Sequence, residues 1–173
     1  VEERTMKTAS KNSGCQVFSW RRTNALRDHF ALYASEHELA VLRIGGLAGP
    51  LAQLDAGDGQ RLVFLSEGLA GRCICDASTK APIAMYERNW QGVGGKLRIA
   101  NGGRLRWLRA GGRWSPDRML ANADGEALVH FAANGTVTNL VTGGPDEAVS
   151  SPDLLLVVAL GWLLIALARD RVR

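Results

Sequence analysis

Residues 154–168 read LLLVVALGWLLIALA, and this apolar run decides how the rest of the chain is interpreted. A helix-start signal precedes it, with Ser151 as the candidate N-cap, Pro152 at the first helical position and Asp153 beside the positive helix end. Arginines follow the run, as the negative end of a helix favours. The sequence therefore predicts a helix over residues 152–169 that is apolar on every side. Such a helix must be surrounded by lipid or by a protein core.

The length of this apolar run does not decide between lipid and a protein core. Residues 154–168 would rise about 22 Å at 1.5 Å per residue. A bilayer core of about 30 Å needs roughly 20 residues. The run is short for a membrane span and long for an ordinary surface helix, so both environments stay open at this point.

Composition sets broad limits on the class of protein. A chain of 173 residues predicts one domain, here residues 17–173, after a polar lead-in over residues 1–16 that we expect to be loose. Hydrophobic residues make up 46% and charged residues 22%, which is typical of a globular chain rather than a disordered one. The net charge of +4 is compatible with anionic partners such as lipid headgroups without requiring them.

The central part of the chain alternates short apolar stretches with turn signals. Asp58-Gly59, Asp124-Gly125 and Asn134-Gly135 are examples of these turns. Many short strands at this spacing predict an antiparallel sandwich or barrel, while residues 19–27 could form a strand or a helical turn. The predicted strands are Phe30–Ala34, Leu39–Ile44, Leu51–Leu54, Leu62–Leu65, Arg72–Asp76, Ile83–Glu87, Lys96–Ala100, Arg104–Arg109, Arg118–Ala121, Ala127–Phe131 and Val137–Val141.

One hairpin can be worked out in more detail. If Asn101-Gly102-Gly103 is a three-residue loop with Gly103 in the left-handed region, Ile99 opposes Leu105 and Leu97 opposes Trp107. Because cross-strand partners share a face, the apolar side chains then lie on one face and Arg98, Arg104 and Arg106 on the other. A two-residue loop would mix the two faces, so the pattern favours the three-residue loop.

The predicted strands and the predicted C-terminal helix can bury each other's apolar surfaces. The strands have one apolar face to bury, and the only helix that the sequence predicts is apolar all round. A closed antiparallel barrel of about 11–12 strands around a buried C-terminal helix covers both surfaces and leaves no free sheet edge. The predicted fold is therefore mainly β, with residues 152–169 as the central helix.

This layout resembles the superfamily of tubby C-terminal domains, LURP-one-related proteins and phospholipid scramblases. The resemblance rests on the ending SPDLLLVVALGWLLIALARD, residues 151–170, and on strand–turn units such as LANADGEALV, residues 120–129. It implies a tubby-like barrel that acts by binding. The chain has no proline-rich N-terminus, palmitoylatable cysteine cluster or acidic calcium loop, so the resemblance does not imply scramblase activity. No phosphoinositide-binding residues can be carried over by position.

The sequence contains no motif that indicates catalysis or a bound cofactor. Cys73 and Cys75 share one face of a predicted strand and could join Cys15 at a metal, but no CxxC pair accompanies them. We interpret this pair as small side chains facing the core or the lumen, and we expect no metal and no small-molecule cofactor. An enzyme with a groove or lumen site stays an alternative for which no nucleophile or base stands out.

The best surface candidate is a group of arginines on and near one strand face: Arg98, Arg104, Arg106, Arg109 and Arg113. Such a row could meet lipid phosphates, whereas stacking aromatics that would favour nucleic acid are not interleaved with it. We predict a monomeric, non-enzymatic binding domain that associates with anionic phospholipid. The absence of a signal peptide and of a disulfide framework favours the cytoplasm. The alternative is a tail-anchored protein with residues 154–168 in lipid.

Overall fold

The computed structural model describes residues 16–24, 28–45, 49–90, 94–112, 114–140 and 151–170. In this part of the chain twelve strands precede one helix, α1 (Ser151–Asp170). The predicted helix over residues 152–169 agrees with α1 to within one residue at each end. The strands are β1 (Gln16–Asn24), β2 (His29–Ala34), β3 (His37–Ile44), β4 (Ala52–Ala56), β5 (Arg61–Glu67), β6 (Gly71–Asp76), β7 (Pro82–Arg88), β8 (Gly95–Ile99), β9 (Arg104–Arg109), β10 (Arg118–Ala121), β11 (Ala127–Phe131) and β12 (Thr136–Asn139).

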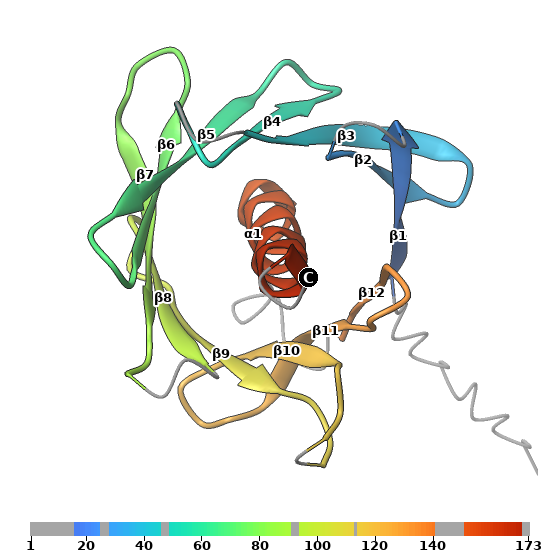
Figure 1. Ribbon diagram of the computed structural model, residues 1–173, viewed down its shortest axis with the longest axis vertical. Coiled ribbons are helices and arrows are strands. Elements are labelled where there is room, and N and C mark those ends of the chain that lie inside the picture. Colours follow the sequence, from blue (N-terminus) through green and yellow to red (C-terminus); the bar gives the residue numbers. More distant parts are fainter. Residues whose placement is uncertain are drawn as a thin grey trace, which may run out of the picture.

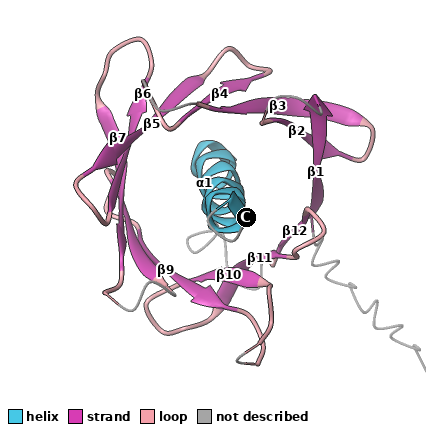
Figure 2. Ribbon diagram, in the orientation of Figure 1, coloured by secondary structure: helices cyan, strands magenta, loops and turns pink. Residues whose placement is uncertain are grey.

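The strands form a closed antiparallel barrel with α1 along its axis (Figure 1). Each strand pairs with its neighbours in the chain, and β1 pairs with β12 to close the sheet, as Figure 2 shows. The predicted mainly β barrel around the C-terminal helix is thus confirmed. The undecided stretch over residues 19–27 contributes to β1, which ends at Asn24. The predicted loose lead-in lies outside the described residues, apart from Gln16, which begins β1.

The predicted pairing of β8 with β9 was wrong in register but right in its faces. Leu97 opposes Leu105 and Gly95 opposes Trp107, so the loop is Ala100–Gly102 rather than residues 101–103. A turn bond from the Gly102 N–H to the Ile99 carbonyl closes this loop, and Gly102 takes the left-handed conformation, with φ at 99°. The side-chain period of two explains why the faces survive, since the partner of each residue shifts by two positions and an even shift keeps every side chain on its face.

The core lies between the inner face of the barrel and the surface of α1. The helix is buried on all sides from Leu156 to Leu163, as an all-apolar helix requires. Trp162 stacks on Trp20 of β1, with ring centroids 6.2 Å apart, and meets the edge of Phe30 at 5.7 Å. Because α1 is enclosed in this way, the helix that a tail-anchored protein would place in lipid lies inside the sheet. Among the described residues, no helix is long and apolar enough to cross a bilayer.

The direction of α1 distinguishes the two ends of the barrel. At the end where α1 begins, the Asn101 amide donates to the Asp153 carboxylate at 2.6 Å. At the other end the Arg169 guanidinium donates to the Ala133 carbonyl, next to β11. We call the first the helix-start end and the second the helix-finish end. The turns β5–β6, β7–β8 and β9–β10 all lie at the helix-finish end because the strands alternate in direction.

Candidate anion-binding surface

The outer face of β8 and β9 carries a row of positive charge. Along both strands buried and exposed residues alternate, so the apolar side chains line the core and the basic ones face solvent. The exposed members, which we call the basic face, are Lys96, Arg98, Arg104 and Arg106. Its three arginines were predicted from the sequence to lie on the outer face, and the structure places them there together.

The pairing of the two strands brings like charges directly opposite one another. Lys96 lies across from Arg106, and Arg98 lies across from Arg104. Like charges at directly opposed positions destabilise an antiparallel pair. The basic face is therefore an arrangement that works against sheet stability rather than for it.

Only part of this charge is neutralised by neighbouring strands. Glu87 of β7 lies across from Lys96 but forms its ion pair with Arg98. Within the part of the chain that the structure describes, Lys96, Arg104 and Arg106 take part in no ion pair. Three exposed cations are thus available to bind an anion such as a phosphate group.

One further predicted site residue that the structure describes, Arg109, does not share the outer face with the basic face. Arg109 follows Trp107 by two positions, so it lies on the inner face of β9, at the end of the strand. The sequence analysis placed Arg109 near the arginine face, and its parity with Trp107 gives the face of the strand that it occupies. Arg113 lies outside the described residues. Lys96 was missed, although its spacing of two from Arg98 would have placed it on the same face.

The cysteine pair lies on the outer face of β6, where Cys75 is buried and Cys73 half-buried, so the expected direction of the thiols, toward the core or lumen, was wrong. Ile74 occupies the inner position on β6 and is fully buried, which directs Cys73 and Cys75 to the other face. Their sulfur atoms are 3.4 Å apart. Burial, and then the neighbouring Cys75, raise the pKa of the Cys73 thiol to about 11. Among the described residues no cluster of three histidine, cysteine or acidic side chains could hold a metal.

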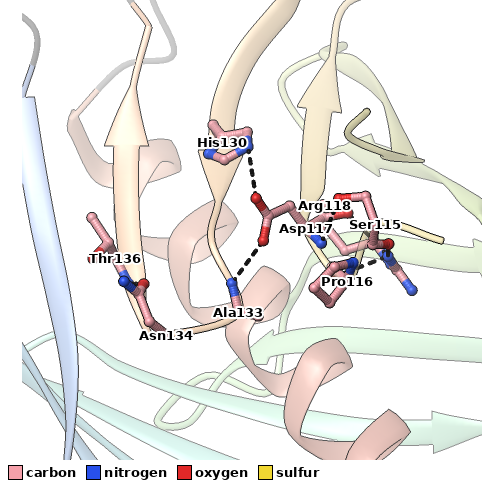
Figure 3. Close-up of polar contacts among 8 residues, drawn as sticks. All are labelled: Ser115, Pro116, Asp117, Arg118, His130, Ala133, Asn134 and Thr136. Carbon is pink, nitrogen blue, oxygen red and sulfur yellow. Dashed lines mark hydrogen bonds and ion pairs between the residues drawn. The ribbon is translucent and has the colours of Figure 1, made fainter. Parts of the chain in front are cut away.

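A network of polar contacts holds the turn between β9 and β10 (Figure 3). The Asp117 carboxylate accepts a hydrogen bond from the Ala133 N–H at 3.0 Å and lies 3.7 Å from His130 Nε2. Arg118 donates to the carbonyl oxygens of Ser115, Pro116 and Asp117 at 3.0–3.2 Å. Arg118 lies across from Arg109 in the β9–β10 pair, and burial, and then the charge of Arg109, lower the pKa of Arg118. The turn is therefore braced by Arg118 at the start of β10 and by the backbone of Ala133 after β11.

No protein-family model, curated protein or solved structure matches this chain. The closed barrel around a central helix is the fold that the sequence patterns predict. The functional argument rests on the surface of the chain itself.

Proposed function

We propose that this protein is a non-enzymatic binding domain that associates with anionic phospholipid through the basic face of β8 and β9. The observation that carries this proposal is the pairing of Lys96 with Arg106 and of Arg98 with Arg104. An arrangement that weakens the sheet is easiest to explain if an external anion neutralises it. Among the described residues, the one ion pair that a member of the basic face forms joins Arg98 to Glu87.

A phospholipid surface suits this group better than a nucleic acid does. Proteins that bind single strands combine basic grooves with exposed aromatic rings on the same surface. On β8 and β9 the aromatic residue is Trp107, which is buried in the core. The cytoplasmic leaflet supplies a negative surface, and each basic residue near it contributes about 1 kcal/mol. The unpaired cations of the basic face would then give on the order of 3 kcal/mol, a reversible association at the membrane periphery.

The resemblance to tubby-like proteins also supports a non-enzymatic binding role. In this chain α1 fills the interior of the barrel, which leaves the outer surface for binding. The tail-anchored alternative would require α1 to leave the barrel and expose the inner face of the sheet to water.

The test is sedimentation with vesicles of phosphatidylcholine alone or mixed with phosphatidylserine, at low and high salt. We expect the protein to bind the mixed vesicles at low salt and to be released at high salt, because surface charges are screened. A variant with Lys96, Arg104 and Arg106 changed to glutamine should lose most of this binding. The matched control changes Arg21, Arg61 and Lys80 to glutamine, with the same loss of charge elsewhere. Equal binding by the two variants, or no binding by the native protein, would refute the proposal.

A further inference from the structure

The largest exposed apolar side chains gather at one end of the barrel. Leu69 is 95% exposed, Trp90 is 93% exposed and Trp114 is 89% exposed. Leu69 lies in the β5–β6 turn, Trp90 after β7 and Trp114 before β10. All three therefore lie at the helix-finish end, and we call them the apolar tips.

The apolar tips follow one another around the rim. The turns that carry them join strands β5 to β10, which are consecutive in the barrel. Neighbouring strands are about 4.8 Å apart, so successive turns are separated by roughly 10 Å along the rim. The tips thus form an arc on one side of the helix-finish end rather than three unrelated surface residues.

Hydrogen bonds hold the turns that present the apolar tips. The Arg88 N–H donates to the Ala70 carbonyl at 3.0 Å, which links the turn of Leu69 to the strand that precedes Trp90. The Asn89 N–H donates to the Gly94 carbonyl at 2.8 Å, closing the β7–β8 loop at its base. The β9–β10 turn is braced by Asp117 and Arg118 as described above (Figure 3). Because these hydrogen bonds hold the turns in place, the apolar tips are fixed in exposed positions.

Charge is distributed unevenly between the two ends of the barrel. The helix-finish end carries Arg72, Arg88, Arg109, Arg118 and Arg169. The helix-start end carries Asp58, Asp76, Asp124, Glu126 and Asp153. Counter-charges offset part of this asymmetry: Asp28, Glu67 and Asp117 lie at the first end, and Arg61, Lys80, Arg98 and Arg104 lie at the second. An anionic surface would therefore attract the end that carries the apolar tips and repel the other.

We propose that the helix-finish end docks onto a lipid bilayer, with Leu69, Trp90 and Trp114 inserted at the level of the headgroups. Tryptophan favours this depth because its ring is apolar and its N–H is polar. Exposed apolar side chains rimmed by cations mark membrane or protein contacts, and the excess of positive charge at this end attracts anionic headgroups. The proposal rests on the lipid-binding function above and gives it an orientation.

The basic face and the apolar tips are compatible with a single docked pose. Lys96 and Arg106 are the pair of the basic face nearer the helix-finish end, since Lys96 directly follows the first residue of β8. The turns of Trp90 and Trp114 flank this pair of strands at the same end. A barrel tilted toward β8 and β9 would place both surfaces against the bilayer, and burial of the tips would add to the weak attraction of the charges.

The test uses vesicles of phosphatidylcholine with and without phosphatidylserine, and acyl chains brominated at known depths. Changing Trp90 and Trp114 together to serine should lower the vesicle partition coefficient by about tenfold or more for each tryptophan. In the native protein, bromine near the headgroups should quench the tryptophan fluorescence. The variant should lose this quenching, because its remaining tryptophans, Trp20, Trp107 and Trp162, are buried. Val17→Ser, which changes an exposed apolar residue on β1, serves as the control and should bind as the native protein does.

The outcomes separate this proposal from the one on which it rests. If the serine variant binds as the native protein does while the variant of Lys96, Arg104 and Arg106 does not, insertion is refuted and binding by the basic face stands. If the tips are required but neutral and acidic vesicles bind equally, insertion stands and the preference for anionic lipid is refuted. Native protein that binds neither vesicle refutes both. Self-association that the serine variant abolishes, without vesicle binding, would instead identify the tips as a contact between copies.

Discussion

The ring of Phe131 lies directly against the backbone of α1 at Gly161. A Cβ atom at position 161 would be 2.3 Å from Cε1 and Cζ of this ring, well inside contact distance. Phe131 is fully buried and meets Trp107 edge to face, with ring centroids 5.2 Å apart. Glycine in a helix interior costs roughly 1 kcal/mol relative to alanine, and here close packing of the ring offsets that cost.

Gly161→Ala should therefore destabilise the protein despite the better helix propensity of alanine. Overpacking of a full core costs about 1–3 kcal/mol, because the ring or the helix must shift. Urea unfolding followed by tryptophan fluorescence measures the change. Gly112→Ala is the control, since its added Cβ would meet nothing within 4 Å. A Gly161→Ala protein as stable as the control variant would contradict the packing of Phe131 on Gly161.

A chain ending at residue 149 should fail to form the barrel. Each large apolar side chain of α1 that is removed forfeits about 1.5–3 kcal/mol of burial, and the total exceeds the stability of an ordinary domain. Circular dichroism and size-exclusion chromatography should report aggregation or loss of structure. Leu160→Ala removes a single buried side chain and should give a folded barrel that is less stable by about 2–5 kcal/mol. A soluble, folded truncated chain would show that α1 is dispensable.

Asp76 should stabilise the protein only when it is ionised. The Ser78 hydroxyl and the Thr79 N–H donate to its carboxylate and lower its pKa from 3.8 to about 2. Since the folded state holds the proton less tightly than the unfolded state, the stabilisation is full above about pH 4 and is lost as the pH falls toward 2. Asp76→Ala should lower the urea midpoint at neutral pH. The gap between variant and native protein should narrow between about pH 4 and pH 2, and a constant gap would argue against this role of the charge.

The Cys73 thiol should react slowly with alkylating reagents at neutral pH. Only the thiolate is nucleophilic, and burial together with Cys75 raises the pKa of this thiol to about 11. The rate of carboxamidomethylation of Cys73, measured by site-resolved mass spectrometry of the native protein, should rise until the pH approaches the thiol pKa. The same protein unfolded in urea provides the reference rate for an ordinary thiol. A native rate equal to that reference would mean that Cys73 is fully solvated.

The architecture could be predicted because two independent patterns required each other. Residues 154–168 needed apolar surroundings, and the strands needed something to cover their inner face. The faces of β8 and β9 followed from a period of two, which survived a displaced register. The register itself depended on which glycine took the left-handed conformation, and Gly102 and Gly103 are equivalent in the sequence pattern.

The surface was harder to predict than the core. Arg109 was predicted only to lie near the arginine face, and its parity with Trp107 places it on the inner face of β9. Trp90 and Trp114 lie in turns, where no periodicity indicates which way a side chain faces. A signal was present, however, since both tryptophans fall between predicted strands, in stretches rich in glycine. The turns of Trp90, Trp114 and Leu69 share one end of the barrel, and this follows only from the strand order.

The seam between β1 and β12 joins Gln16 to Asn139, and the helix that fills the interior comes later still in the chain. During translation the sheet therefore cannot close until β12 has left the ribosome. Its inner face stays exposed to water until α1 emerges. Contacts so distant in sequence make folding slow, and unpaired strand edges invite aggregation in the interval. Production of this protein in cells should accordingly be sensitive to chaperone supply and to any event that halts synthesis between these two elements.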